Sequence, residues 1–139
     1  MQIKECLTKD VKWTTPDTTA TEIAKMMKEN DIGSVPIGEN DKLTGMVTDR
    51  DIVVNCLAEG LNPSETSASE FMSEGVLYCY DTDSAEEVLE NMGQKKISRM
   101  PVVNSDKRLV GIVSIGDLSS HFPNNEKLGK TVENIKEAA

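Results

Sequence analysis

The sequence predicts an α+β protein made of two βαββα units that pack around a pseudo-twofold axis. Three observations predict this class. The chain repeats itself at an offset of 65 positions, each copy alternates short strand-like segments with an amphipathic helical segment, and a Ser-, Thr- and Pro-rich stretch separates the copies. A chain of 139 residues has room for one domain of this kind or for two very small repeated units.

The internal repeat is the most informative feature of the chain. At an offset of 65, the matching pairs are Glu5 with Glu70, Val11 with Val76, Ala20 with Ala85, Glu22 with Glu87, Met27 with Met92, Ile32 with Ile97 and Pro36 with Pro101. One residue is inserted in the second copy, after which the pairs are Leu43 with Leu109, Gly45 with Gly111, Val47 with Val113 and Asp51 with Asp117. Chance similarity would not keep this order with one gap in a turn. We therefore expect a first repeat at 5–60, a linker at 61–69, a second repeat at 70–122 and a polar tail at 123–139.

Each repeat is expected to begin with a short strand and a helix. The strand pattern covers 11–14 and 76–79, and the helical pattern covers 20–31 and 85–96. Thr18 or Thr19 precedes Glu22 at the start of the first helix, which is the spacing of a capping box. Asp83 or Ser84 occupies the corresponding place in the second copy.

The second half of each repeat is expected to contain two strands and a last helix. The strands cover 34–37 with 43–48, and 100–103 with 109–114; the helices start in 49–60 and 116–122. Pro36 and Pro101 lie in the first strand of each pair, which suits a strand end or a sheet edge.

Composition excludes several classes of function. The net charge of −9 argues against a nucleic-acid partner. The chain has neither the ~18 successive apolar residues that span a membrane nor an apolar N-terminal signal, so we expect a cytoplasmic protein. Cys6, Cys56 and Cys79 form no C-x-x-C pair, which argues against a disulfide frame and a zinc site. We expect no metal site, no required cofactor and no catalytic residues, because neither an activated nucleophile nor a Gly-rich phosphate loop is present.

A hydroxyl residue ends the last strand of each repeat, and an aspartate follows three positions later. Thr48 precedes Asp51, and Ser114 precedes Asp117. The hydroxyl can cap the following helix, and the carboxylate can accept two hydrogen bonds from the vicinal diol of a ribose. From spacing alone, the alternative is a plain helix cap that only stabilises the fold.

These residues carry a resemblance to a known family. The G-h-h-[TS]-x-x-D endings at 45–51 and 111–117, the Val35-Pro36 and Met100-Pro101 pairs and the βαββα repeat resemble the CBS domain family. The chain resembles one tandem CBS pair, a Bateman module, over about residues 5–122, and it is similar to small stand-alone bacterial CBS-pair proteins. The resemblance implies a regulatory module that binds AMP, ADP, ATP, S-adenosylmethionine or a similar adenosyl nucleotide and acts on a separate, unknown effector protein. NAD or cyclic di-AMP is an alternative ligand, and a ligand-free dimerisation module is an alternative function.

The resemblance also implies two ligand clefts between the paired modules. Cleft A would use Thr48, Arg50 and Asp51 over Met46, with an opposing wall of Val76, Leu77, Ile97, Ser98 and Arg99. Cleft B would use Ser114 and Asp117 over Ile112, with an opposing wall of Val11, Trp13, Thr14, Ile32, Gly33 and Ser34.

Charge distinguishes the two expected clefts. Arg50 and Arg99 would both lie in cleft A, and guanidinium groups suit phosphate oxygens, so we expect phosphate-bearing nucleotides to prefer it. The alternative is that both arginines are ordinary surface or interface charges. The resemblance further implies a homodimer formed through helices. The apolar residues that could form its seam, or fill the core instead, are Val53, Val54, Leu57, Leu118 and Phe122.

Overall fold

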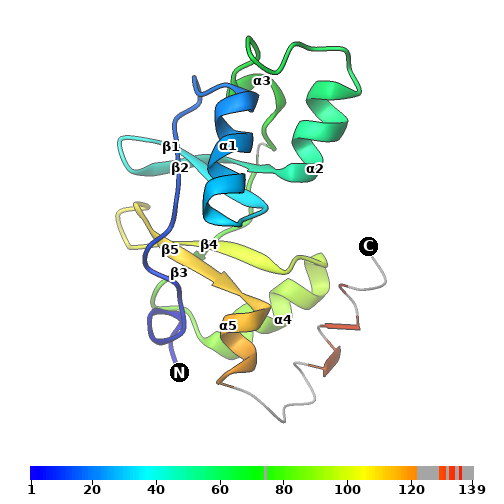
Figure 1. The fold of residues 1–139 in the computed structure, drawn as a ribbon. Coiled ribbons are helices and arrows are strands. Elements are labelled where there is room, and N and C mark those ends of the chain that lie inside the picture. The colour runs from blue at the N-terminus through cyan, green and yellow to red at the C-terminus, as the bar shows by residue number, and fades with distance from the viewer. Residues whose placement is uncertain (74, 122–128, 131, 134, 136–139) are drawn as a thin grey trace. The chain divides into compact units, whose positions relative to one another are not determined.

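The computed structural model describes residues 1–73, 75–121, 129–130, 132–133 and 135 (Figure 1). These residues form two compact units. The central unit is Lys12–Val76, and the split unit joins Met1–Val11 to the part of the chain from Leu77 onward. Phe122 and most of the expected polar tail lie outside the described residues.

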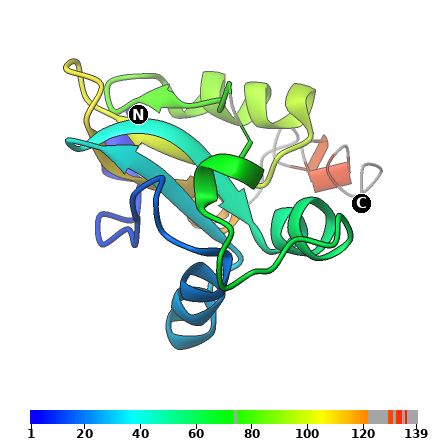
Figure 2. The same cartoon turned by 90° about the horizontal axis from the view of Figure 1, so that it is seen from above.

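The central unit contains a long helix, an antiparallel hairpin and a series of shorter helices. In order these are α1 (Ala20–Asn30), β1 (Ser34–Glu39), β2 (Lys42–Thr48), α2 (Asp49–Asp51), the π-type helix η2 (Ile52–Leu57) and α3 (Ala68–Phe71). Strands β1 and β2 pair antiparallel, and Figures 1 and 2 show α1 lying against this hairpin. The core residues come from all of these elements except α2: Ala20, Ile23, Met27, Val35, Ile37, Val47, Ile52, Cys56, Ala68 and Phe71.

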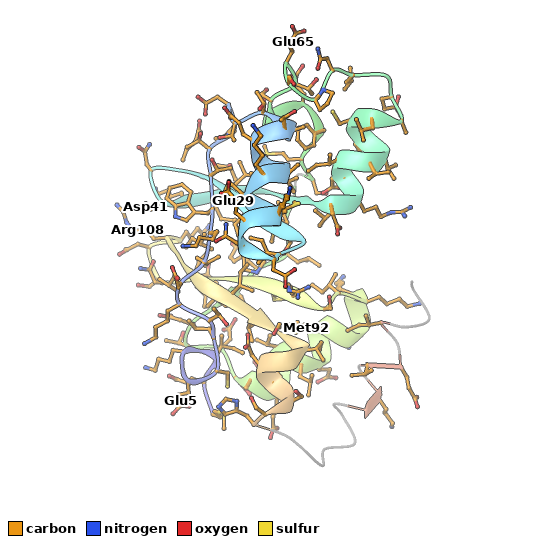
Figure 3. The ribbon with its side chains drawn as sticks, viewed as in Figure 1. Glu5, Glu29, Asp41, Glu65, Met92 and Arg108 are labelled. Carbon is orange, nitrogen blue, oxygen red and sulfur yellow. The ribbon has the colours of Figure 1, made fainter. Side chains whose placement is uncertain are left out.

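The split unit repeats this arrangement. Its elements are the 3-10 turn η1 (Ile3–Glu5), β3 (Cys79–Tyr80), α4 (Ala85–Lys95), β4 (Arg99–Val103), β5 (Leu109–Ser114) and α5 (Ile115–Ser119). Strand β4 pairs parallel to β3 and antiparallel to β5. Met92 of α4, labelled in Figure 3, and Ile3 of η1 are both fully buried in the core of this unit. The predicted α+β class with two repeated units is thus confirmed.

The two main helices match the predicted segments to within one residue at each end. Thr19 caps α1 in a capping box with Glu22, whereas Ser84 precedes α4 without a side-chain cap hydrogen bond. Asp31 and Lys96 end the helices in the left-handed conformation, with φ of 52° and 58°. Each of these two residues donates its N–H to a carbonyl of the preceding turn, which closes the helix.

The first strand of each repeat is shorter than the sequence predicts. In the central unit it is reduced to a bridge, in which Thr14 donates its N–H to the Pro36 carbonyl at 3.1 Å and accepts the Gly38 N–H at 2.9 Å. The next bond of this parallel ladder would need an N–H on Pro36, and proline has none. Pro101 sets the same limit in the split unit, where β3 is only two residues long. The prediction of strands over 11–14 and 76–79 was therefore wrong in extent.

Each unit includes the leading segment of the other repeat. Thr8 pairs with Ile112 in the split unit, and Ser73, its counterpart at an offset of 65, pairs with Met46 in the central unit. The units therefore divide the chain after Val11 and after Val76. The division into repeats and linker at 61–69 concerns sequence similarity and stays a prediction.

Candidate functional site

The end of β2 places a hydroxyl and a carboxylate together. The Thr48 Oγ1 accepts the N–H of Asp51 at 3.1 Å, and the Asp51 Oδ2 accepts the N–H of Thr48 at 2.8 Å. This is a complete capping box, in which each side chain satisfies a backbone donor that the helix leaves unpaired. The sequence prediction that the hydroxyl caps this helix is confirmed.

The end of β5 repeats the arrangement in the split unit. The Ser114 Oγ accepts the N–H of Asp117 at 3.0 Å, and the Asp117 Oδ2 accepts the N–H of Ser114 at 3.0 Å. Two sites that match in residue type, spacing and hydrogen bonding therefore exist, one in each unit. We call them the Asp51 corner (Thr48–Asp51) and the Asp117 corner (Ser114–Asp117).

Capping leaves acceptor capacity on both carboxylates. An ionised carboxylate offers about four lone-pair positions, and the cap occupies one of them. The Asp51 Oδ1 accepts a long hydrogen bond of 3.3 Å from the Asn55 amide, and both oxygens of Asp117 lie 3.4 Å from the Thr8 hydroxyl. Both aspartates are half-buried. A cap and a ligand contact are therefore compatible roles for the same side chain.

The strand opposite each corner contributes further predicted site residues. Ser34 lies opposite Thr48 in the β1–β2 register, and Arg99 lies opposite Ser114 in the β4–β5 register. Directly opposite residues in an antiparallel pair have side chains on the same face. Just before these strands, the carbonyl of Gly33 accepts the Asp49 N–H at 3.0 Å. In the split unit the carbonyl of Ser98 accepts the Ile115 N–H, also at 3.0 Å.

The structure therefore brings residues 32–34 to the Asp51 corner and residues 97–99 to the Asp117 corner, each within its own unit. The grouping predicted from the sequence was the other way, across the clefts, and it stays a prediction. The two arginines of the predicted site accompany different corners within their own units, with Arg50 in α2 beside Thr48 and Arg99 at the start of β4 opposite Ser114.

Asp49 is a residue of the Asp51 corner that was not among the predicted site residues. It is exposed, and its Oδ1 accepts the N–H of Arg50 at 2.8 Å. A Cβ added at Gly33 would lie 3.1 Å from the Asp49 Oδ2, so glycine gives this carboxylate its space. A sequence signal for the contact between Asp49 and Gly33 did exist. It is an aspartate in the first turn of a helix, together with a glycine that strand pairing brings close. The corresponding residues of the Asp117 corner are Ile115 and Ser98, so the corners differ here in charge.

The remaining predicted site residues fall into two groups. Met46 and Ile112 lie opposite Pro36 and Pro101 in their hairpins. Thr14 forms the bridge to Ile37, and the other residues lie outside regular strands: Val11, Trp13, Val76 and Leu77. Trp13 and Leu77 keep 36% and 44% of their surface exposed, so both side chains have surface available for a contact.

The three thiols are free and buried. Burial, with a smaller effect of Asp83 and Asp81, raises the pKa of Cys79 to about 12. Burial also raises the pKa of Cys6, followed by the effect of Glu5. All three cysteines are core residues: Cys6 and Cys79 in the split unit, and Cys56 in the central unit.

The rest of the described chain offers few further features that could form a site. No group of three or more His, Cys, Asp or Glu side chains that could hold a metal ion occurs among the described residues. A depression of about 570 Å³ in the central unit is lined by Thr15–Asp17, Glu39, Asn40, Ser67 and Ser69, and none of the predicted site residues borders it. Among the helices described, none has the length and apolar character needed to cross a membrane.

Comparison with known proteins identifies the family. The chain is 43% identical over 106 residues to hypoxic response protein 1 of Mycobacterium tuberculosis, covering 76% of this chain and 73% of that protein. It is 36% identical over 133 residues to the CBS domain-containing protein YhcV of Bacillus subtilis, covering 96% and 94%.

Solved structures agree with this result. The crystal structure of hypoxic response protein I with two coordinated zinc ions superposes with a TM-score of 0.79 at 37% identity, covering 87% of this chain and 98% of that one. The CBS domain pair of protein MJ0100, in complex with 5′-methylthioadenosine and S-adenosyl-L-methionine, gives 0.77 at 28% identity, covering 88% and 96%. The profile of the CBS domain family matches residues 3–57 and 68–124, and the chain therefore belongs to the CBS domain family, with two CBS domains.

Proposed function

We propose that this protein is a regulatory module without catalytic activity that binds an adenosyl nucleotide and acts on a separate effector protein in the cytoplasm. The single observation that carries the proposal is the pair of half-buried carboxylates, Asp51 and Asp117, each held by a capping box with acceptor capacity to spare. A ribose presents two adjacent hydroxyls, and a fixed carboxylate is the group that accepts from both.

A relative supports the chemical class of the ligand. The CBS pair of MJ0100, 28% identical to this chain, is solved with 5′-methylthioadenosine and S-adenosyl-L-methionine. Both compounds contain adenosine, whose ribose diol is the group that the two corners suit. We therefore propose AMP, ATP or S-adenosylmethionine as the regulatory ligand.

The arginines favour phosphate-bearing ligands. Arg50 and Arg99 are exposed, and a guanidinium group can donate two parallel hydrogen bonds to phosphate. We propose that nucleotides with phosphate bind more tightly than adenosine, through the arginines together with Thr48, Ser114 and the two aspartates. The expected preference of phosphate for cleft A over cleft B is part of this proposal.

We also propose that two copies of the chain associate through η2 and the turn that follows it. Val53, Leu57 and Leu61 keep 56%, 52% and 40% of their surface exposed, and Val54 keeps 38%. Apolar side chains concentrated on one short segment are typical of a protein interface. Leu118 takes no part, since it is fully buried in the split unit, and Phe122 lies outside the described residues.

One experiment tests the function and identifies the ligand. The protein is purified without added nucleotide and denatured, and the released small molecules are identified by mass spectrometry. Emptied protein is then titrated calorimetrically with AMP, ATP, S-adenosylmethionine, NADH and cyclic di-AMP. The proposal expects saturable binding of at least one adenosine compound that carries a free ribose diol. If no adenosine compound is released and none of the five binds, the proposal is wrong and a ligand-free interaction module takes its place.

A further inference from the structure

Thr8 lies at the Asp117 corner although 109 positions separate the two residues in the chain. The backbone fixes its place. The Thr8 N–H donates to the Ile112 carbonyl at 2.8 Å, and the Thr8 carbonyl accepts the Ile112 N–H at 3.0 Å. The leading segment of the chain therefore delivers this hydroxyl to a site that the second repeat provides.

The glycine of the G-h-h-[TS] motif permits this approach. A Cβ added at Gly111 would lie 2.5 Å from the Thr8 carbonyl oxygen and 2.6 Å from Leu7 Cδ1. Real Cβ atoms do not come so close to a backbone oxygen, so a side chain at position 111 would push the segment away. The position of Thr8 is thus a consequence of the same motif that supplies Ser114 and Asp117.

The Thr8 hydroxyl lies equally far from both carboxylate oxygens of Asp117. The Thr8 Oγ1 lies 3.4 Å from Oδ1 and 3.4 Å from Oδ2, whereas O–H···O hydrogen bonds are typically about 2.7–2.8 Å. The hydroxyl is therefore held at both carboxylate oxygens without a strong bond to either. A group that binds to both oxygens would come within reach of Thr8 Oγ1, which can donate and accept.

We propose that Thr8 is a ligand-contacting specificity residue of the Asp117 corner, where its hydroxyl hydrogen-bonds to the sugar diol that Asp117 accepts. This inference rests on the proposed function and adds the N-terminal segment to the site. It gives a reason why two backbone hydrogen bonds to Ile112 hold Thr8 in a place where its hydroxyl makes only a weak contact with Asp117. It also makes the Asp117 corner selective for ligands that keep the ribose 2′-hydroxyl.

The Asp51 corner provides the matched comparison. The counterpart of Thr8 there is Ser73, whose backbone pairs with Met46 in the same way at 3.0 and 3.3 Å. The side chain that donates to the Asp51 carboxylate is Asn55. The Thr8 effect should therefore belong to the Asp117 corner, and a change at Ser73 should not reproduce it.

The experiment measures AMP and 2′-deoxy-AMP binding by calorimetry on the full chain with Asp51→Asn, a change that keeps a cap acceptor and weakens the first corner. Thr8→Val, Thr8→Ser, Ser73→Ala and Asp117→Ala are compared in that background. We expect Thr8→Val to weaken AMP binding about fivefold, which is the usual effect of one neutral hydrogen bond, and to leave 2′-deoxy-AMP binding within twofold. Thr8→Ser should restore AMP binding, and Ser73→Ala should leave it unchanged.

The possible failures are distinguishable. If Thr8→Val weakens AMP and 2′-deoxy-AMP equally, its role is structural and the inference is wrong. AMP binding that depends on Asp117 but is unchanged or tighter in Thr8→Val also overturns it, while the proposed function stands. If Asp117→Ala has no effect on AMP binding, Asp117 does not hold the nucleotide and the inference fails with that part of the proposed function. If the unsubstituted chain binds no AMP, the inference is wrong for AMP, while the titrations with ATP and S-adenosylmethionine decide the proposed function.

Discussion

Thr48 and Asp51 hold each other through two reciprocal hydrogen bonds, of 2.8 Å and 3.1 Å, at the point where β2 becomes α2. Each residue supplies one side-chain acceptor and one backbone donor. The same pair of bonds joins Ser114 and Asp117 in the split unit. In both units the residue proposed to bind the ligand is therefore also a residue that stabilises the fold.

The two roles of Asp51 can be separated by substitution. Asp51→Ala removes the cap acceptor and should lower the free energy of unfolding by about 1 kcal/mol, as loss of a helix cap does. Asp51→Asn keeps one oxygen acceptor for the Thr48 N–H, so it should cost less stability while still losing bidentate acceptance of a diol. Urea unfolding of the two variants measures the first effect and AMP titration measures the second. Equal unfolding free energies for the two variants would contradict the structural role of the cap.

The two motif glycines should differ in how well they tolerate a methyl group. A Cβ at Gly111 would meet the backbone oxygen of Thr8, whereas a Cβ at Gly45 would meet the Met72 sulfur, also at 2.5 Å. A flexible methionine can move aside, and a paired backbone cannot. We expect Gly111→Ala to lower the free energy of unfolding by about 1–3 kcal/mol, as overpacking does, and Gly45→Ala to lower it by less. Urea unfolding compares the two variants. A larger loss of unfolding free energy for Gly45→Ala would count against the close approach of the Thr8 backbone to Gly111.

The leading segment should contribute stability to the split unit through Ile3. Its side chain is fully buried in a core made mostly of residues from the second repeat. Ile3→Ala leaves a cavity there and should lower the free energy of unfolding by about 2–5 kcal/mol. Lys4→Ala, at an exposed neighbouring position, is the matched control and should change the free energy of unfolding by less than about 0.5 kcal/mol. Equal effects of the two changes in thermal and urea unfolding would show that the segment does not pack as described.

Cys79 should make stability depend on pH in the alkaline range. Burial raises its pKa to about 12 in the folded protein, whereas an unfolded thiol ionises near pH 8.5–9. Above about pH 9 the unfolded state therefore loses this proton first, and stability falls by up to about 1.4 kcal/mol per pH unit until the folded thiol also ionises. Cys79→Ala lacks this contribution. The difference in unfolding free energy between wild type and Cys79→Ala should shrink from pH 8 to pH 10, and a constant difference would contradict the assignment.

The repeat and the main elements could be predicted because local sequence dictates them. Helices α1 and α4 carry apolar residues at helical spacing and directly follow Thr19 and Ser84, so their positions followed from periodicity and from the residue types at their starts. The capping pair of Thr48 and Asp51 is equally local, since three positions separate the two residues.

Contacts between distant segments could not be predicted in the same way. The exchange of leading segments depends on Thr8 pairing with Ile112 and Ser73 pairing with Met46, and neither pair has a local sequence signal. The shortening of the first strand at Thr14 was also missed. It arises because Pro36, in the neighbouring parallel strand, has no N–H to donate to the next carbonyl of that segment. The position of residues 97–99 beside Ser114 follows from strand register, which the sequence analysis left open.

The central claim is that the two capped aspartates bind the ribose of an adenosyl ligand. The most direct measurement is calorimetric titration of emptied wild-type protein and the Asp51→Asn, Asp117→Asn double variant with AMP and S-adenosylmethionine. Far-ultraviolet circular dichroism confirms in parallel that the variant is folded. We expect saturable binding of at least one of these ligands by the wild type and at least tenfold weaker binding by the folded double variant. Unchanged affinity in the folded double variant would show that the two aspartates do not bind the ribose.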